Sequence, residues 1–470
     1  MEQSRRHLLE ALGGASLAGL AGCSVLENTT GQAHSLTGDY EVTEFVDRDG
    51  TELRLEGSTD RFQYAGMMAQ LTHSSPSRNK DWINEAIEIA DEYNIGAFRV
   101  WGFPAPADDI PAPHQAPGEF NDAWIDLFDY SVAKAKENGV RLIVPLLQGV
   151  HTKTDRPPRY KEAPSPVAYG NWSSTADYQG PNTAAFIDDK QANAYFKEYI
   201  EYVLTHENQY TGVEYRNEPT ILCWECANEL EYKSENRRGN SMAAWYSDIA
   251  GYINSLGAQQ LVSTGMHGSM GKIYQSWTER CAYIEDHRVD EIDLCTFHDY
   301  PVYWGSEDDV VQIRAPELAK KYAAHKIQLA NEVIEKPVYC GEYGSLFKPT
   351  ARGADYSRIE FAESASDIDR REEFPPYREQ KDAYEGVFTT RRETEFPTAN
   401  LDLRKEYFGH MTDVAEEHDM DGVQFWRLAR DTSPGTSAEE RQESDPLIVY
   451  GNDTGTLSMV RDYHETVVMS

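Results

Sequence analysis

Two carboxylates in this chain follow buried strands, in a pattern that could carry chemistry. The apolar run 221–226 is followed by Asn228 and Glu229, and Glu342 comes directly after the apolar run 337–341. Burying polar groups costs free energy, so a polar pair at the end of a core strand indicates function. Two carboxylates about 5 Å apart can hydrolyse a glycosidic bond with retention, because one protonates the leaving oxygen while the other attacks the anomeric carbon.

Other predicted strand ends carry groups that suit the same chemistry. Arg99 ends the second strand, and a cation beside a carboxylate keeps it ionised. His298 and Tyr300 follow the sixth strand two residues apart and therefore share a face. Trp426, at the end of the eighth, offers an apolar floor for a sugar ring, and Asn228 can bind a sugar 2-hydroxyl. Each residue alone is more often structural, so the prediction depends on their joint occurrence.

The elements that must position these residues alternate regularly along the chain. Eight short apolar runs alternate with segments of helical periodicity, which predicts an α/β fold with a parallel sheet, and eight strands predict a single closed (β/α)8 TIM barrel. The runs are residues 62–66, 96–102, 140–147, 221–226, 260–264, 292–297, 337–341 and 422–426, and the main helical segments are 82–93, 124–138, 191–210, 242–256, 315–333 and 402–418. The alternative, an open doubly wound sheet, would need a glycine-rich phosphate loop after the first strand, where the sequence has none.

Segments outside this alternation have their own signatures. Residues 41–57 alternate apolar and polar types around Asp49-Gly50, which predicts an N-terminal β-hairpin that covers the bottom of the barrel. The connections 148–190 and 345–400, after strands three and seven, are long enough to be functional loops. Their aromatic residues either stack on sugars or pack their own loop. Residues 431–470 form either a last strand and helix or a lobe beside the cleft.

The chain is strongly acidic, and this limits its partners. Its 470 residues include 79 acidic and 44 basic side chains, a net charge of −35, which excludes nucleic acid and anionic membrane surfaces as partners. The acidic residues are spread along the chain, so our hypothesis is adaptation to high salt in a halophilic source, and the alternative is an ordinary acidic secreted protein. The cysteines beyond Cys23 are odd in number and dispersed, which predicts small buried side chains rather than disulfides or a zinc site.

The N-terminus predicts export. Residues 4–9 (SRRHLL) are similar to a twin-arginine signal, and the apolar stretch that follows ends in Leu-Ala-Gly-Cys at Cys23, which is similar to a lipoprotein processing box. We therefore divide the chain into a signal (1–22), a polar tether (23–39) and a catalytic domain (40–470). Cys23 would carry the lipid that anchors an extracellular protein to the membrane, its only membrane attachment. The alternative is a soluble secreted protein cleaved nearby.

The sequence also resembles a known family, glycoside hydrolase family 5, and within it the endo-β-1,4-mannanases. The resemblance is densest at residues 186–232, which include Trp-Glu-Cys-Ala-Asn-Glu at 224–229. It continues through His-Asp-Tyr-Pro at 298–301 and Gly-Glu-Tyr-Gly at 341–344, and it ends at Asp-Gly-Val-Gln-Phe-Trp at 421–426. Together these motifs span most of residues 40–430.

The resemblance implies a role for each matching residue. Glu229 is implied to be the acid/base, with a pKa raised by burial and by the second carboxylate, and Glu342 the nucleophile. The implied sugar subsite is Arg99, Asn228, His298, Tyr300 and Trp426, to which we add Trp101 and His267 as substrate-binding residues. The chain departs from the family at His267, where mannanases commonly have Glu, at Leu230-Glu231, where Pro and Arg are common, and at residues 148–150, where Asn-Asn-Trp is usual.

These observations predict a retaining, endo-acting β-glycoside hydrolase that cleaves β-1,4-mannosidic bonds in mannan-type polysaccharides. The departures from the family lie on the substrate-facing side, so a β-1,4-glucanase or a transglycosylase stays open, as does a lipoprotein that only binds glycans. Protonation by a carboxylic acid activates the leaving group, so the prediction includes no metal and no cofactor.

Overall fold

The protein is described here by a computed structural model. It describes residues 41–72, 80–103, 112–149, 162–173, 183–230, 241–268, 282–300, 316–344, 401–430 and 448–468. The predicted export signal, Cys23 and the tether lie outside these residues, as does the long connection 345–400.

Eight parallel strands form the central sheet, and all eight were predicted. They are β3 (Tyr64–Ala69), β4 (Ala97–Arg99), β7 (Arg141–Pro145), β8 (Ile221–Glu225), β9 (Leu261–Ser263), β10 (Cys295–Asp299), β11 (Val338–Tyr343) and β12 (Gly422–Ala429). Their order is β10-β11-β12-β3-β4-β7-β8-β9. A parallel bridge from Ser263 to Leu294 and the bond from the Asp293 amide to the Val262 carbonyl (2.8 Å) join β9 to the start of β10. The sheet is therefore a closed barrel, as predicted.

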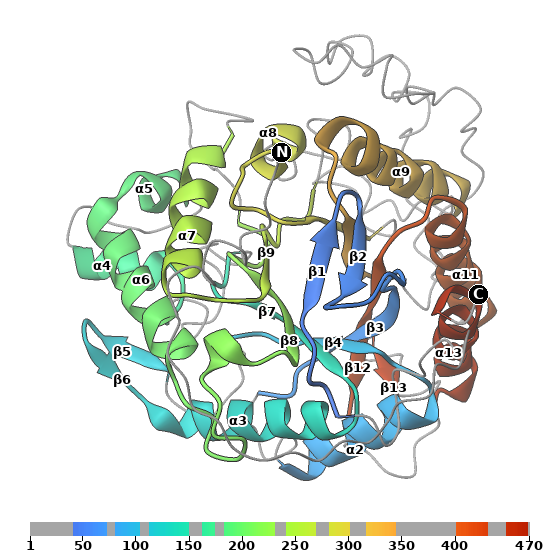
Figure 1. Cartoon of the computed structure of the whole chain (residues 1–470), viewed down its shortest axis with the longest axis horizontal. Coiled ribbons are helices and arrows are strands. Elements are labelled where there is room, and N and C mark those ends of the chain that lie inside the picture. Colours follow the sequence, from blue (N-terminus) through green and yellow to red (C-terminus); the bar gives the residue numbers. More distant parts are fainter. Residues whose placement is uncertain are drawn as a thin grey trace, which may run out of the picture. The chain divides into compact units, whose positions relative to one another are not determined.

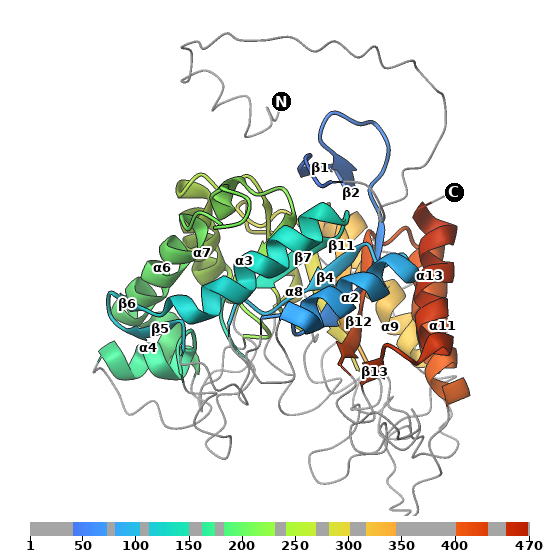
Figure 2. The ribbon, with the colours of Figure 1, turned by 90° about the horizontal axis from the view of Figure 1, so that it is seen from below.

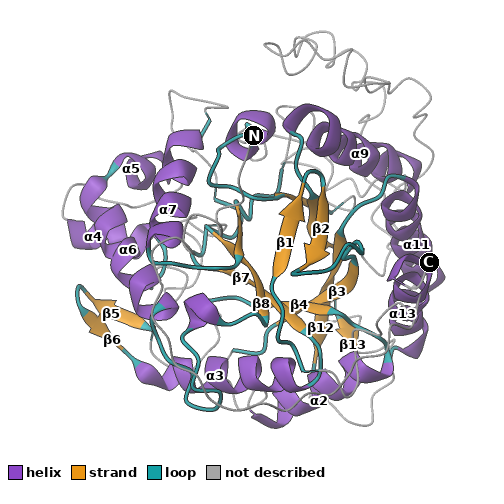
Figure 3. Cartoon of the chain, in the orientation of Figure 1, coloured by secondary structure: helices purple, strands orange, loops and turns teal. Residues whose placement is uncertain are grey.

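Helices cover the outside of this barrel (Figures 1 and 3). The six predicted segments form α2 (Lys80–Glu92), α3 (Asp122–Glu137), α6 (Lys190–Leu204), α7 (Ala243–Ser255), α9 (Pro316–Gln328) and α11 (Leu401–Glu417). The described residues also form the shorter helices α4 (Pro166–Ser173), α5 (Thr183–Asp188), α8 (Tyr283–His287), the 3-10 helix η3 (Tyr215–Asn217) and the π-helix η6 (Leu329–Ile334). Helix α6 begins where it does because the Asp189 side chain accepts hydrogen bonds from the amides of Gln191 and Ala192.

The predicted N-terminal hairpin covers the bottom of the barrel. It consists of β1 (Val46–Asp49) and β2 (Glu52–Leu55), and Figures 1 and 2 show it across one end of the barrel. The Leu53 amide donates to Asp421, which immediately precedes β12, and this places the hairpin at the amino ends of the strands. The hairpin therefore closes the barrel at the face opposite Glu229 and Glu342.

The C-terminal residues that the structure describes form a last strand and helix, which was one of the two open alternatives. Strand β13 (Val449–Tyr450) pairs in parallel with the end of β12, and α13 (Thr454–Val468) packs on α11 and β3. A second small hairpin, β5 (His114–Ala116) with β6 (Glu119–Phe120), follows β4 and was not predicted. Its polar, short strands lack the alternation that marks a strand in the sequence.

The core has two layers, which the strand side chains enter alternately. Val46, Leu53 and Cys223 belong to the layer inside the barrel, whereas Trp224 and Cys226 pack outward against the helices. The four cysteines that the structure describes beyond the N-terminus are all free and buried, as predicted: Cys223, Cys226, Cys295 and Cys340. Cys281 lies outside the described residues.

Two aromatic residues of the connection after β7 pack against neighbouring elements, the β5 strand and helix α6. Tyr169 on α4 is fully buried, and its hydroxyl lies 3.2 Å from Nδ1 of His114, while Trp172 contacts the rings of His114 and Tyr195. Tyr169 is therefore a packing residue rather than a sugar-stacking one, whereas Trp172 is part-exposed and its predicted contact with sugars stays a prediction. Tyr160 and Tyr178 of the same connection lie outside the described residues. In the part of the chain that the structure describes, no helix is both long and apolar enough to cross a membrane.

Candidate active site

Arg99 is the centre of a buried polar network at the carboxyl ends of the strands. Its side chain is fully buried at the end of β4. Nη1 donates to Oε1 of Glu342 at 2.5 Å, and Nη2 donates to Oδ1 of Asn228 at 2.8 Å. The guanidinium also binds Glu225, with Nη2 2.6 Å from Oε2 and Nε 3.0 Å from Oε1. One arginine thus links residues from strands β4, β8 and β11.

The two predicted carboxylates lie together. Glu229, His298 and Glu342 each offer an atom within 4.8 Å of the others, so a carboxylate oxygen of Glu229 lies no farther than that from one of Glu342. Nδ1 of His298 is 2.5 Å from Oε1 of Glu229 and 3.6 Å from Oε2 of Glu342. The Tyr300 hydroxyl donates to the same Oε2 at 2.5 Å. Glu342 is therefore held by Arg99 on one oxygen and by Tyr300 on the other.

The backbone of Glu229 has an uncommon conformation. Its φ is +51°, in the left-handed region that non-glycine residues seldom occupy. The amide of Glu229 donates to the Gly265 carbonyl at 2.8 Å, and the Asn228 carbonyl accepts from the Gly149 amide at 2.9 Å. Neighbouring strand ends thus hold this turn in place, and strain of this kind occurs where a side chain must be aimed.

Burial controls the electrostatics of the site. It raises the pKa of Glu342, and His298 opposes the rise whereas the Glu229 carboxylate adds to it. Arg99 and the Tyr300 hydroxyl both lower the pKa of Glu342. Burial also lowers the pKa of His298 to about 4, so this imidazole is neutral near pH 7. One of its ring nitrogens then donates and the other accepts, which suits a residue that orients the Glu229 carboxyl.

Aromatic rings form an apolar floor beside the carboxylates. Trp101 stacks on Phe103 with ring centroids 5.2 Å apart, and the Trp426 ring lies 6.0 Å from Trp101 and 6.2 Å from Tyr300. Trp426 is part-exposed. His267 is buried after β9, where its carbonyl accepts from the His298 amide at 3.0 Å. The structure therefore brings together all the site residues that the sequence predicted, apart from Cys23.

Comparison with known proteins agrees with this geometry. The family model described as GH family 5 beta-mannosidase-like matches residues 43–437. The chain belongs to glycoside hydrolase family 5. Among curated relatives of this family 5 enzyme, mannan endo-1,4-beta-mannosidase 3 of Arabidopsis thaliana is 25% identical over 65% of this chain and 72% of its own length. Mannan endo-1,4-beta-mannosidase 5 of Solanum lycopersicum is 26% identical over 64% of this chain and 70% of its own length.

Solved structures support the fold of the family 5 enzyme. The endo-1,4-beta-mannanase of Rhizomucor miehei aligns with a TM-score of 0.61 at 19% identity, covering 91% of this chain and 100% of its own. The endo-1,4-beta-D-mannanase of Thermotoga petrophila aligns with a TM-score of 0.57 at 22% identity, covering 86% of this chain and 100% of its own. The family membership makes the protein a glycoside hydrolase, and these two alignments confirm the (β/α)8 barrel.

Two residues of the network were missed by the sequence analysis. Glu225 and Tyr339 lie inside the apolar runs of β8 and β11, and the Tyr339 hydroxyl donates to Oε1 of Glu225 at 2.6 Å. The available signal was a carboxylate inside a run of buried apolar residues, since such a charge must have a partner. Glu229 and Glu342 follow apolar runs and were predicted for that reason, whereas Glu225 and Tyr339 lie within such runs.

The same cluster offers metal-type ligands. Among the residues that the structure describes, Glu229, His298 and Glu342 are the group whose atoms are close enough to surround an ion. Each of the three already has a partner within the site, and acid catalysis by a carboxyl pair uses the same oxygens.

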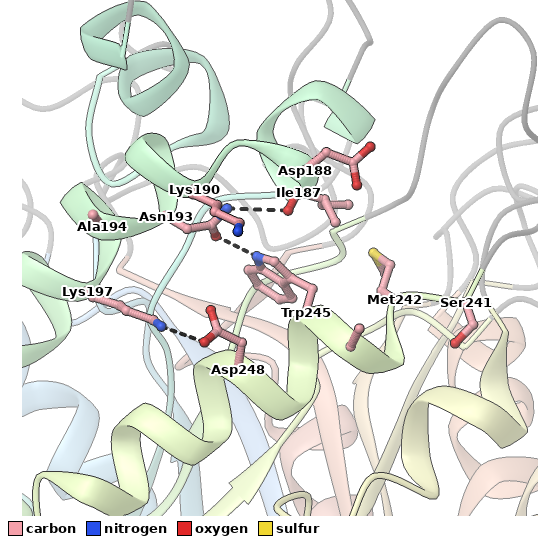
Figure 4. A pocket seen from close by; sticks show the side chains of 11 residues that line it. Ile187, Asp188, Lys190, Asn193, Ala194, Lys197, Ser241, Met242, Trp245 and Asp248 are labelled. Carbon is pink, nitrogen blue, oxygen red and sulfur yellow. Dashed lines mark hydrogen bonds and ion pairs between the residues drawn. The ribbon is translucent and has the colours of Figure 1, made fainter. Parts of the chain in front are cut away.

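A separate cavity lies between α6 and α7 of this hydrolase (Figure 4). Its volume is about 570 Å³, and Trp245 lies in its wall, where the indole donates to the Asn193 side chain at 2.6 Å. Lys197 and Asp248 form an ion pair at 2.7 Å on another part of the wall. None of the residues around Arg99 and Glu342 lines this cavity, so it is distinct from the candidate active site.

Proposed function

We propose that this hydrolase is a retaining endo-β-1,4-mannanase, with Glu229 as acid/base and Glu342 as nucleophile. The observation that carries the proposal is the closeness of the pair, whose oxygens come within 4.8 Å. Retaining enzymes have carboxyl groups about 5–5.5 Å apart, whereas inverting enzymes separate them by about 6.5–9.5 Å to admit a water molecule. The names of the curated relatives, mannan endo-1,4-beta-mannosidases, support mannan as the substrate.

The first step forms a covalent glycosyl-enzyme. Oε1 or Oε2 of Glu342 attacks the anomeric carbon while the protonated Glu229 donates its proton to the leaving glycosidic oxygen. The Arg99 and Tyr300 donors hold Glu342 in place, so little reorganisation is needed at the moment of attack. His298, neutral and 2.5 Å from Glu229, orients the acid.

The second step regenerates the enzyme. Glu229, now ionised, takes a proton from a water molecule, which attacks the anomeric carbon and releases Glu342. Asn228 binds the sugar 2-hydroxyl in this proposal, because Arg99 fixes its Oδ1 and the amide nitrogen, which donates one hydrogen to Gln148 at 3.4 Å, has a second hydrogen to donate. Trp101 and Trp426 supply the apolar floor of the subsite.

The test combines substrate choice with product stereochemistry. Purified enzyme would be assayed for reducing ends on mannan, glucomannan and carboxymethyl cellulose at low and molar salt, and the first-formed anomer would be followed by proton NMR. We expect hydrolysis of mannan and glucomannan with the β-anomer formed first. Preference for carboxymethyl cellulose would make the protein a glucanase, longer products would make it a transglycosylase, and α-anomer would contradict the role of Glu342.

The N-terminal sequence and the charge of the chain support a proposed location and habitat. We propose export by the twin-arginine route, a lipid at Cys23 and function in high salt, with the net charge of −35 as the main support for the last. Changing Cys23 to Ala should move the protein from the membrane fraction to the medium. The unfolding midpoint should rise between low and molar salt, and a midpoint that stays constant would contradict the adaptation to salt.

A further inference from the structure

Glu225 lies beneath the catalytic pair and is the main partner of Arg99. It is the last residue of β8 and is fully buried. Both oxygens of the Glu225 carboxylate accept hydrogen bonds from side chains of other strands. Nε of Arg99 donates to both oxygens, Nη2 of Arg99 donates to Oε2, and the Tyr339 hydroxyl donates to Oε1. The Glu225 carboxylate thus occupies one edge of the guanidinium, while Nη1 is directed to Glu342.

We propose that Glu225 is a positioning residue that fixes the Arg99 guanidinium and shares its positive charge with Glu342. This inference rests on the proposed role of Glu342 as nucleophile. A guanidinium is planar, so a carboxylate bound along its Nε–Nη2 edge determines where Nη1 points. Without Glu225, two nitrogens of the Arg99 guanidinium could bind both oxygens of Glu342. Tyr300 would then no longer set the orientation of the Glu342 carboxylate.

The charges around the site support this sharing. Burial lowers the pKa of Arg99, but Glu225 and Glu342 together raise it above its ordinary value, so the guanidinium keeps its charge between two carboxylates. An ion pair with one undivided arginine would make Glu342 a weaker nucleophile, because the pair would have to be broken during attack. Because Glu225 also pairs with Arg99, the attraction between Arg99 and Glu342 is weaker. The charge of Glu225 also acts on His298: burial lowers the pKa of His298, and Glu225 opposes that effect.

Several buried titratable groups surround these carboxylates in the part of the chain that the structure describes. The titratable groups whose charges act with Glu225 or Glu342, beyond Arg99, Glu229 and Tyr300, are Tyr64, Cys223, Cys226, His298, Tyr339 and Cys340. Burial raises the pKa of each of these tyrosines and cysteines, and it lowers that of His298 to about 4.

Gly265 lies close to both the backbone and the side chain at this end of β8. Its φ is +69°, and a Cβ added there would collide with the Ala227 carbonyl and come 2.8 Å from Oε2 of Glu225. A buried ion pair is a poor source of stability compared with apolar packing, so a carboxylate inside a barrel strand is better explained by what it positions. Glu218, seven residues earlier, offers a matched control because it is also fully buried and bonded to a cation, Lys136.

The experiment compares Glu225→Gln with Glu218→Gln. Glu225→Gln keeps the shape and removes the charge, so we expect kcat to fall about 100-fold, as for a misplaced reacting group, with KM changed much less. The acidic limb of the kcat/KM profile should move to lower pH, because one negative charge beside Glu342 is gone. Glu218→Gln should lower the thermal midpoint and leave both kcat and the limb unchanged. An unshifted limb in Glu225→Gln, or the same shift in both variants, would overturn the proposal.

A milder variant covers the case in which Glu225→Gln does not fold. Tyr339→Phe removes one hydrogen bond from Glu225 and leaves every charge in place. We expect kcat to fall about fivefold, the effect of one buried hydrogen bond, with KM and the acidic limb unchanged. An unaltered kcat would overturn the positioning role.

A direct readout separates this inference from the proposed function. The rate at which a 2-deoxy-2-fluoro-mannosyl fluoride labels Glu342 would be measured by mass spectrometry as a function of pH. No label on Glu342 in the wild type, together with no activity on any β-glycan, would reject the proposed function itself. Label on Glu342 with the same rate and pH dependence in wild type and Glu225→Gln would reject only the role of Glu225.

Discussion

The two ends of strand β8 each carry a buried glutamate, and the two are held in different ways. Glu218, in the turn before the strand, accepts from the Thr220 amide at 3.1 Å and the Thr220 hydroxyl at 2.8 Å, in addition to Lys136 at 2.9 Å. The carboxylate of Glu225, at the other end, accepts from side chains of β4 and β11, Arg99 and Tyr339. One carboxylate is thus held largely by its own turn, and the other by strands far away in the sequence.

The different partners of Glu218 and Glu225 indicate different roles, in stability for Glu218 and in function for Glu225. At the amino end, local bonds satisfy the charge, and Glu218 joins a turn that also binds Gln260 through its carbonyl. At the carboxyl end, the bonds run from residue to residue across the barrel and reach Glu342 and Glu229, whose side chains stay 5% and 15% exposed. A network of this kind places reactive groups at a surface, and it exists only when the barrel is closed.

The largest expected effect is at the carboxyl end, in Glu342→Ala. Loss of the nucleophile should reduce kcat on mannan by about 10⁴-fold or more, as removal of a central catalytic group does. Because the side chain is at the mouth of the barrel, the thermal midpoint should change little. Initial rates and thermal unfolding measure the two quantities, and a reduction of only a few-fold would contradict the assignment.

The next effect is that of Glu229→Ala, which distinguishes the two carboxylates from each other. Loss of general acid catalysis should cost about 10²–10⁴ in kcat on mannan. An aryl mannoside with a good leaving group needs no proton, so its first step should be nearly unaffected. Pre-steady-state release of the phenolate gives the measurement, and equal losses on both substrates would show that Glu229 is not the acid.

At the amino end, Glu218→Gln should change stability and not activity. Loss of the charge leaves Lys136 and the Thr220 donors with a weaker acceptor, for which we expect about 2–3 kcal/mol of lost unfolding free energy. Denaturant unfolding of the folded variant, set beside its kcat on mannan, tests the comparison. Equal damage to kcat would mean that the two ends of β8 do not differ in role.

The effect expected of Tyr300→Phe is smaller than those of Glu342→Ala and Glu229→Ala, and it acts through pH. The Tyr300 hydroxyl donates to Glu342 and lowers the pKa of that carboxyl, so its removal must raise the pKa. Glu342 then becomes protonated at higher pH, and the acidic limb of kcat/KM moves upward. The loss of kcat/KM should therefore be larger at pH 5 than at pH 7. A limb that moves downward would show that the bond favours the protonated form.

Some of these regions could be predicted from the sequence and others could not. The eight strands were found because buried parallel strands are continuous apolar runs, and Glu229 and Glu342 were found because they follow such runs. The β5–β6 hairpin was missed because its strands are short and carry no alternation. Tyr169 was ambiguous because an aromatic ring on a long loop has the same sequence signal whether it packs inward or faces a ligand.

The sequence by itself determined the periodicity of the barrel and which residue types end each strand, because both follow from local patterns of apolar and polar side chains. Only the tertiary structure decided that Arg99 divides its charge between Glu225 and Glu342. That arrangement depends on strand stagger and on closure of the sheet, which bring residues more than a hundred positions apart within hydrogen-bonding distance. Packing between elements sets these distances, so they cannot be predicted from a short stretch of the sequence.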